Sequence, residues 1–435
     1  MNILKDSILI LLLIAPFVGV SQINPTFNSI PASFNINSPN PVYALDINYD
    51  NIDVNQQAFH LFLPDTTGVY PLVIFIHGGG FQSGSRDIVM SNPELITSIK
   101  YFLERDIAFA SIGYRLLSSS GPPDNEGVIK CLEDSKYALQ FIRYYSSDLF
   151  LNPNKIALKG KSAGAGTSLW LATRSDMANP NSLDPVLHSS TRVCAVEVNN
   201  PQSTYDFYKW ETEVFNNFDG QGSNYTANSM SDLLGFDRYN SFYGGTVDSV
   251  YDILYDPALI QYRQDVDMLF HMTSDDAAIY LTNTIADVHP SDNVLHHPLH
   301  AKVLNDYALS VNISEIKTTV AALGINTTQG ESPDEFLERQ LNSCAQITGI
   351  VHNTTNNDFD IYPNPANSQI TINTGTIEII TDIKVFSISG KLILEKHNII
   401  SETISIPTHN WNTGIYIVQI TNGMGIQRNN KLIIQ

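Results

Sequence analysis

The sequence has little positive charge. Its 24 lysines and arginines stand against 44 aspartates and glutamates, which leaves a formal net charge of −20. Residues 358–435 hold six acidic and five basic residues, so residues 1–357 carry −19 of this charge. A surface of this sign repels phosphate backbones and anionic lipid headgroups, so we expect no nucleic-acid partner. A neutral or cationic substrate is easier for it to accept.

Cysteine is also scarce. The three cysteines, Cys131, Cys194 and Cys344, are too few for a disulfide scaffold. One bridge with one free thiol is an alternative in an oxidising compartment, but we favour three buried thiols, because unpaired cysteine behaves as a small apolar residue. None of the three stands in a metal-ligand pattern such as Cys-x-x-Cys.

Long apolar runs are missing except at the N-terminus. The run from Ile8 to Val20 is shorter than the roughly 20 residues that cross a bilayer. Small residues, Gly19 and Ser21, stand at the −3 and −1 positions of a cleavage site. We therefore predict a secretory signal peptide over residues 1–21, with an uncleaved anchor as the alternative.

From about Ala58 to Cys344, short apolar runs alternate with longer helical patterns. This alternation predicts an α/β fold, with a mostly parallel sheet flanked by helices. One helix is expected over residues 126–145, and the last begins at Ser332, where a capping serine precedes a proline and two acids. The predicted strands are residues 72–76, 107–112, 155–159, 193–198, 268–272 and 316–321.

The composition changes after Cys344. A polar run, Asn-Thr-Thr-Asn-Asn at residues 353–357, suits neither helix nor strand. Beyond it, short β-rich runs alternate with turn residues, which predicts a small all-β sandwich. We therefore expect a main domain over residues 22–350, a linker over residues 351–357 and a β-sandwich domain over residues 358–435.

Residues 160–164 read Gly-Lys-Ser-Ala-Gly and match the Gly-x-Ser-x-Gly pattern of a nucleophile elbow. The pattern follows the predicted strand 155–159, and helix-forming residues resume at 168–172. Glycines tolerate the sharp turn, and the helix N-terminus lies under the charge that develops during attack on an acyl carbon. This context predicts a nucleophilic Ser162.

Residues 77–81 read His-Gly-Gly-Gly-Phe and follow the predicted strand 72–76, 85 residues before Ser162. Glycines at the end of a strand let backbone N–H groups approach an oxyanion. The alternative is a plain glycine turn, but the order and spacing relative to Ser162 favour an oxyanion loop.

Both motifs, together with Gly-Tyr-Arg-Leu at residues 113–116 and Asn-Pro-Asn-Lys-Ile at residues 152–156, resemble the carboxylesterase and hormone-sensitive-lipase branch of α/β-hydrolases. The resemblance is strong over residues 58–175 and weak from 200 to 345. It implies an α/β-hydrolase fold and action on carboxylic esters, without a metal or a cofactor.

The same resemblance assigns roles to individual residues. Ser162 is the expected nucleophile, and the backbone N–H groups of Gly79, Gly80 and Ala163 form the expected oxyanion hole. In this fold the acid and the base follow the serine along the chain.

The acid is expected after a strand. Residues 269–276 resemble the family's strand and its Gly-Thr-x-Asp loop, with Met272 where the family has glycine. This places Asp275 at the acid position, with Asp276 as the close alternative. Two solvated loop acids are the other interpretation.

The family's histidine follows the last strand, but residues 323–330 of this chain contain none. Because a triad is defined by geometry rather than by chain order, we predict His296 as the base, then His297. Zinc bound by His296 and His300 is a weaker alternative, because no Glu follows in a His-Glu-x-x-His pattern. If no histidine reaches the serine, the protein lacks a base. The nearest histidines are His289, His296, His297 and His300.

The C-terminal region carries a second resemblance. Residues 359–367, with Gly-Lys at 390–391, Gly-Ile-Tyr-Ile-Val at 414–418 and Lys-Leu-Ile-Ile-Gln at 431–435, resemble the type A sorting domain of the type IX secretion system in Bacteroidota. This resemblance implies recognition by the secretion machinery and a secreted or cell-surface protein. A carbohydrate-binding β-module is the alternative, although Trp411 is the only tryptophan there.

Together these observations predict a secreted serine hydrolase that cleaves carboxylic esters through an acyl-enzyme on Ser162. Its location suggests polymer-linked substrates, such as acetyl or feruloyl esters of polysaccharides. Two other functions remain open. One is a binding protein that kept the elbow but lost its base, and the other is a peptidase of the same fold.

Overall fold

The structure is a computed structural model. It describes residues 23–434 apart from 119–124, 217–225, 246–248, 287–292, 345–359, 365, 374–379, 388–390, 400–402 and 423–426. The predicted signal peptide and linker 351–357 lie outside the described residues. The backbone divides into two compact units, Met1–Thr348 and Gly349–Gln435. Among the described residues, no helix is long and apolar enough to cross a bilayer.

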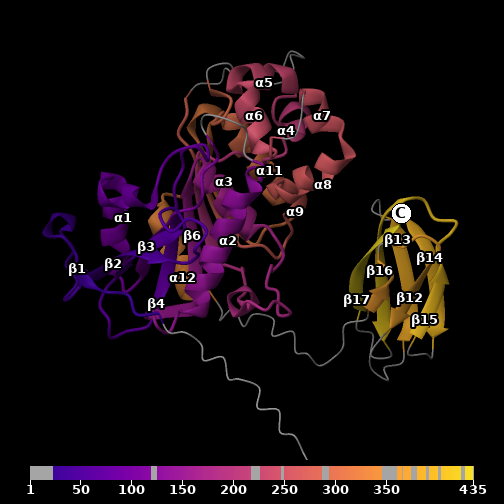
Figure 1. Ribbon diagram of the computed structural model, residues 1–435, viewed down its shortest axis with the longest axis horizontal. Helices are drawn as coiled ribbons and strands as arrows, with labels where there is room; N and C mark the ends of the chain where they lie inside the picture. The colour runs from indigo at the N-terminus through magenta and orange to yellow at the C-terminus, as the bar shows by residue number, and fades with distance from the viewer. Residues whose placement is uncertain are drawn as a thin grey trace, which may run out of the picture. The chain divides into compact units, whose positions relative to one another are not determined.

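The first unit is built on one ten-stranded sheet with the order β1-β2-β3-β5-β4-β6-β7-β8-β9-β10 (Figure 1). The six strands from β5 to β9 in this order are parallel, and the remaining strands are antiparallel to their neighbours. Its strands are β1 Asn28–Ser29, β2 Val42–Asn48, β3 Ala58–Leu63, β4 Tyr70–Ile76, β5 Ala108–Ile112, β6 Leu151–Lys161, β7 Ala195–Asn199, β8 Ala278–Asn283, β9 Ile316–Val320 and β10 Ile325–Asn326.

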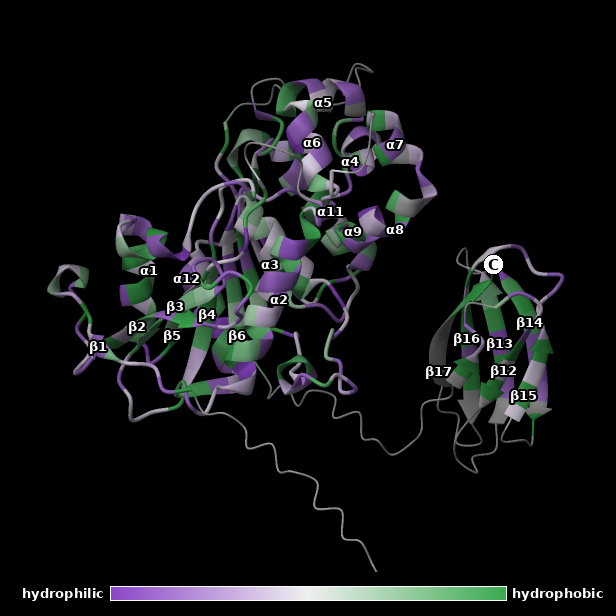
Figure 2. Ribbon diagram, in the orientation of Figure 1, coloured by the Kyte–Doolittle hydropathy of each residue, from purple (hydrophilic) through white to green (hydrophobic). Residues whose placement is uncertain are grey.

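Helices cover both faces of this sheet. Along β4, Leu72, Ile74 and Ile76 join the core beneath α2, α3 and α11, while Val73 and Phe75 join the core beneath α1 and α12. Successive side chains of a strand point to opposite faces, so a strand covered on both sides has to be apolar throughout. Figure 2 shows this in the green central strands. The helices are α1 Pro93–Leu103, α2 Ile129–Tyr144, α3 Ala163–Ala172, α4 Phe207–Lys209, α5 Ala227–Leu234, α6 Phe236–Phe242, α7 Val250–Tyr255, α8 Pro257–Asp265, α9 Met268–His271, α11 Pro298–Ser310 and α12 Pro333–Ser343.

The predicted α/β fold class is confirmed, and so is the start of α12. Ser332 accepts a hydrogen bond from the Glu335 N–H, and the Glu335 carboxylate accepts one from the Ser332 N–H, which is a complete capping box. Between β7 and β8 the chain forms a helical insertion, α4 to α8, grouped beyond α3 in Figure 1.

One predicted strand is wrong. Residues 268–272 were expected to extend, but Met268–His271 forms the short helix α9, whose first turn is capped by the Asp267 carboxylate. The strand is β8, Ala278–Asn283, further along the chain. A short apolar run does not distinguish helix from strand by periodicity, and here the capping aspartate decides in favour of the helix.

The expectation of three buried thiols is also wrong. Cys194 and Cys344 form a disulfide that joins the entry to β7 with the end of α12 across 150 residues of sequence. Cys131 is a free thiol, buried in α2.

The second unit has two antiparallel sheets, with orders β11-β12-β15 and β14-β13-β16-β17. Alternate apolar residues of both sheets, such as Ile370, Ile372, Ile383 and Val418, meet in one core. This is the small β-sandwich that the sequence predicts. Its strands are β11 Asp360–Tyr362, β12 Gln369–Asn373, β13 Ile380–Ser387, β14 Leu392–Ile399, β15 Thr403–Pro407, β16 Gly414–Asn422 and β17 Gln427–Ile434.

Candidate active site

Ser162 stands between β6 and α3, in a backbone conformation that most residues avoid. Its φ is 56° and its ψ is −123°, and its N–H donates to the Asn199 carbonyl at 2.9 Å. A side chain on Gly164 would lie 2.0 Å from the Ile76 carbonyl oxygen, so glycine is needed there for α3 to pack against the end of β4. The strained turn lifts the Ser162 hydroxyl away from the sheet at the C-terminal edge of β6.

His296 lies beside this hydroxyl. Its Nε2 is 2.8 Å from Ser162 Oγ, within hydrogen-bond distance. The histidine belongs to the turn before α11, and its carbonyl accepts a hydrogen bond from the side chain of Asn283, the last residue of β8. Burial, followed by the positive charges of Lys161 and Arg238, lowers the pKa of His296 below its ordinary value of 6.5. The imidazole is therefore neutral near pH 7 and can accept the serine proton.

The two neighbouring histidines have other partners. His297 is buried at the N-cap of α11, where its Nδ1 accepts a hydrogen bond from the Leu299 N–H. His300 is fully buried, with Nε2 3.0 Å from the Val294 carbonyl and Nδ1 3.2 Å from the Ser203 hydroxyl, and burial lowers its pKa to about 3. Of the predicted alternatives, only His296 meets Ser162 among the described residues. His289 lies outside them.

Neither predicted carboxylate reaches the base. Arg192 binds both, with 2.7 Å to Asp275 and 3.2 Å to Asp276. Both acids precede β8, which is parallel to β6 and β7 and pairs Thr282 with Asn199 next to the elbow. At about 3.3 Å per strand residue, they lie about 20 Å from the edge that carries Ser162. We therefore correct the assignment of Asp275, with Asp276 as its alternative. It followed from placing the strand at 268–272 rather than at β8.

The predicted oxyanion loop lies against the elbow. A side chain on Gly78 would stand 2.7 Å from the Lys161 carbonyl oxygen and 3.1 Å from Ser162 Cβ. Gly79 and Gly80 both have positive φ, 117° and 59°, which turns the loop back on itself. Within the described chain, the N–H groups of Gly79, Gly80 and Ala163 donate no hydrogen bond. They are therefore available to an oxyanion.

Buried rings hold this loop in place. The His77 ring stacks on Tyr114 with centroids 4.3 Å apart, and the Tyr114 hydroxyl donates to the His77 carbonyl. Burial lowers the pKa of His77 to about 4, so this ring remains neutral. The Tyr205 hydroxyl donates to the Ala163 carbonyl at 2.9 Å. Such support fixes the donors before a substrate binds.

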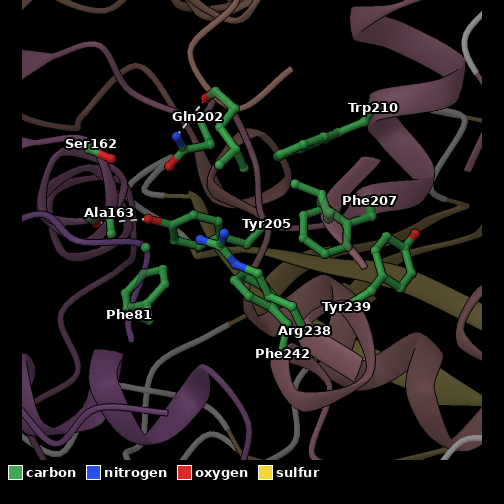
Figure 3. Close-up of a pocket in the computed structure, with 13 residues that line it drawn as sticks. Phe81, Ser162, Ala163, Gln202, Tyr205, Phe207, Trp210, Arg238, Tyr239 and Phe242 are labelled. Carbon is green, nitrogen blue, oxygen red and sulfur yellow. Dashed lines mark hydrogen bonds between the residues drawn. The ribbon is translucent and has the colours of Figure 1, made fainter. Parts of the chain in front are cut away.

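A narrow cavity opens beside Ser162, and its empty space, counted together with its open mouth, is about 450 Å³ (Figure 3). The helical insertion supplies one wall and the oxyanion loop supplies Gly80 and Phe81. The insertion was the part of the chain that the sequence left unassigned. Six aromatic residues line this aromatic cavity: Phe81, Tyr205, Phe207, Trp210, Tyr239 and Phe242.

A second, larger cleft of about 810 Å³ also reaches Ser162. It passes between the oxyanion loop and the start of α1, and its wall includes Ser83, Glu94 and Lys161. Ser162 therefore lies between two spaces, a smaller aromatic cavity and a larger cleft whose lining residues include Glu94 and Lys161. Two such spaces suit the two halves of a molecule divided at the serine.

The strand–serine–helix turn, the adjoining glycine loop and the parallel sheet define an α/β-hydrolase with an esterase-like site. Comparison with protein families agrees with this class. Residues 59–241 match the BD-FAE family, and residues 360–435 match the secretion system C-terminal sorting domain. The chain thus carries a segment similar to the BD-FAE family within its α/β-hydrolase domain, followed by a type IX sorting domain, which indicates a secreted or cell-surface protein.

Curated relatives match over short segments. Juvenile hormone esterase of Heliothis virescens is 28% identical over 127 residues, which is 28% of this chain and 21% of the relative. A carboxylic ester hydrolase of Bombus ignitus is 30% identical over 118 residues, which is 25% of this chain and 19% of the relative. The chain thus spans about a fifth of the length of these relatives.

Solved structures with a similar chain path include esterases. A truncated carbohydrate esterase from gut microbiota has a TM-score of 0.48 at 14% identity, covering 69% of this chain and 96% of its own. An acetyl ester-xyloside bifunctional hydrolase from Caldicellulosiruptor lactoaceticus has a TM-score of 0.42 at 15% identity, covering 74% and 96%.

Proposed function

We propose that the protein is a serine hydrolase that cleaves carboxylic esters through an acyl-enzyme on Ser162. The observation that carries this proposal is the 2.8 Å approach of His296 Nε2 to Ser162 Oγ, next to unengaged backbone donors. The esterase relatives support the reaction class. The catalytic domain is proposed over residues 22–350, and the sorting domain over residues 358–435, after the linker 351–357.

The chemistry follows from the geometry. His296 takes the proton of Ser162 as the hydroxyl oxygen bonds to the ester carbon, and the carbonyl oxygen becomes an oxyanion facing the N–H groups of Gly79, Gly80 and Ala163. The protonated His296 then gives its proton to the alcohol, which leaves. Water, activated by the same imidazole, attacks the acyl-enzyme, and the acid is released with Ser162 restored. No metal or cofactor takes part in these steps.

The two spaces beside Ser162 suggest how the substrate lies. A polymer-linked alcohol needs the larger cleft, so the acyl group is proposed to enter the aromatic cavity. Rings such as Tyr205 and Phe242 favour a planar aromatic acyl group, because stacked and edge-on ring contacts add to the burial of apolar area. Of the two acyl groups considered, feruloyl would make more ring contacts in this cavity than acetyl.

The test is turnover of 4-nitrophenyl acetate and 4-nitrophenyl ferulate, which share a leaving group. Ser162→Ala should abolish turnover of both, and His296→Asn should lower kcat/KM by roughly 10²–10⁴, the usual contribution of a general base. His297→Asn is the matched control, because asparagine can still cap α11. It should retain activity. The ferulate should have the higher kcat/KM.

Each failure has a distinct meaning. Wild-type turnover no faster than that of Ser162→Ala would exclude the esterase and favour the binding protein. Faster cleavage of a 4-nitroanilide than of the matching ester would favour the peptidase. Loss of activity in His297→Asn but not in His296→Asn would exclude the proposed base alone.

A further inference from the structure

Arg238 stands apart from the other arginines of the first unit. It makes no hydrogen bond or ion pair with any residue that the structure describes, although the chain has a large excess of acids. The other described arginines of this unit each bond a carboxylate or a backbone carbonyl: Arg86, Arg105, Arg115, Arg143, Arg174, Arg192, Arg263 and Arg339. Arg238 therefore has an unused guanidinium group.

This group projects into the aromatic cavity. Arg238 extends from α6 of the helical insertion (Figure 3), and it lines the same cavity as Ser162. A side chain on Gly80 would lie 2.2 Å from Arg238 Nη2, so the guanidinium lies directly over the oxyanion loop. A ligand that bonds this group is therefore close to the reacting atoms.

The position is costly without a partner. Arg238 is half-buried between aromatic rings, and the loss of water lowers its pKa, although an arginine stays charged at any physiological pH. A partly desolvated cation is stabilised when an anion bonds it. The planar fork of a guanidinium matches the two coplanar oxygens of a carboxylate.

We propose that Arg238 binds a carboxylate on the acyl part of the substrate, so that half esters of dicarboxylic acids are preferred over neutral esters of equal length. This inference rests on the proposed ester hydrolysis at Ser162. It compares acyl groups of equal length, and so it adds a preference for charge to the ring contacts that favour a feruloyl group. The other cation near the serine, Lys161, faces the second cleft, where we place the alcohol.

At the site, the proposed substrate has the charge opposite to the one that the net charge of the protein favours. A charge of −20 favours neutral or cationic substrates over the surface as a whole. At Ser162, however, the charged groups that act on the His296 ring among the described residues are Lys161 and Arg238, both positive. An anionic acyl group meets a locally positive site within an acidic molecule.

The experiment compares matched 4-nitrophenyl esters in which a terminal methyl is replaced by a carboxylate: hexanoate with hemiadipate, heptanoate with hemipimelate and octanoate with hemisuberate. In the wild type, at least one half ester should have a lower KM than its neutral partner. Arg238→Gln should raise the KM of that half ester about tenfold or more, which is the scale of a lost hydrogen bond between charged groups. The KM of the neutral ester should stay nearly unchanged. In Arg238→Lys, the KM of the half ester should lie between those of the wild type and of Arg238→Gln.

Lys161→Gln is the control for general electrostatics, and it should keep the preference for the half ester. An equal loss of the preference in this variant, or no half-ester preference in the wild type, would overturn the inference. A fall in kcat for both esters in Arg238→Gln, with KM unchanged, would assign the guanidinium to the oxyanion instead. Failure of the proposed function is seen separately, as wild-type protein that does not cleave even the neutral esters.

Discussion

At the scale of residues, the serine and its base come from segments 134 residues apart in the sequence. Ser162 is fixed by the turn between β6 and α3, whereas His296 is held by the turn before α11 and by the Asn283 side chain. Burial and, among the described residues, the positive charges of Lys161 and Arg238 lower the pKa of the imidazole and keep it neutral. The pair is therefore poised for proton transfer at neutral pH, provided that the histidine keeps its position.

The pH dependence of activity should report this environment. Because the pKa of His296 lies below 6.5 and only the neutral imidazole accepts a proton, kcat/KM should rise with pH through a midpoint below 6.5. Removing a positive charge in Lys161→Gln should move this midpoint upward. The measurement is kcat/KM for 4-nitrophenyl acetate between about pH 4 and about pH 8. A midpoint above 6.5, or a downward shift in the variant, would contradict the assignment.

Sequence motifs located the nucleophile and the oxyanion loop because both need glycines at fixed backbone positions. A side chain at positions such as Gly78 and Gly164 would clash with neighbouring atoms, so glycine is required there and the motif can be recognised from the sequence alone. The proposed base was predicted only as one of several clustered histidines, since nothing local distinguishes His296 from the capping His297. The acid could not be placed, because its position depends on which short run forms the strand.

At the scale of elements, that strand is β8. The usual place for an acid in this fold is the turn after a strand at the C-terminal edge of the sheet. The structure describes this turn as far as Ala286, and the next carboxylate in the sequence, Asp287, lies outside the described residues. The error came from Met268–His271, where Asp267 caps a helical turn in a run that reads equally well as a strand. The pairing of β8 with β7 is a tertiary interaction, and no local sequence pattern predicts it.

The disulfide between Cys194 and Cys344 ties α12 to β7. Closing so long a loop lowers the conformational entropy of the unfolded chain, which typically raises the free energy of unfolding by about 2–4 kcal/mol. The double variant Cys194→Ser with Cys344→Ser should therefore lower the Tm. Cys131→Ser is the control, because it removes the free thiol and leaves the disulfide in place. Titration of the unfolded, unreduced wild-type protein should find one thiol, that of Cys131. Three thiols, or an unchanged Tm in the double variant, would show that the bridge is absent.

The helical insertion between β7 and β8 lines the cavity beside Ser162, and we propose that it gives the site its selectivity. It brings Phe207, Trp210, Arg238 and Phe242 to a serine that the sheet positions. Its helices are short and their apolar residues do not follow one clear period, so the sequence predicts neither their packing nor their contribution to the cavity. Loops on a rigid scaffold commonly carry specificity in this way.

At the scale of the whole molecule, the two units have separate cores and separate roles. All the proposed catalytic residues lie in the first unit, whereas the second matches the sorting domain and holds little net charge. Both units were visible in the sequence, because a change in composition and in hydrophobic period marks the boundary between them. What the sequence could not give is the contact of Ser162 with His296, on which the proposed function depends.

The most direct test of that contact is covalent labelling of the purified protein with a phosphonate ester, followed by intact mass and peptide mapping. We expect one adduct per chain, on Ser162, and no adduct in Ser162→Ala. In His296→Asn the adduct should form more slowly by a factor of at least about 10². His297→Asn should label like the wild type. No adduct at Ser162, or labelling at the same rate in His296→Asn, would contradict the proposal that this serine is armed by His296.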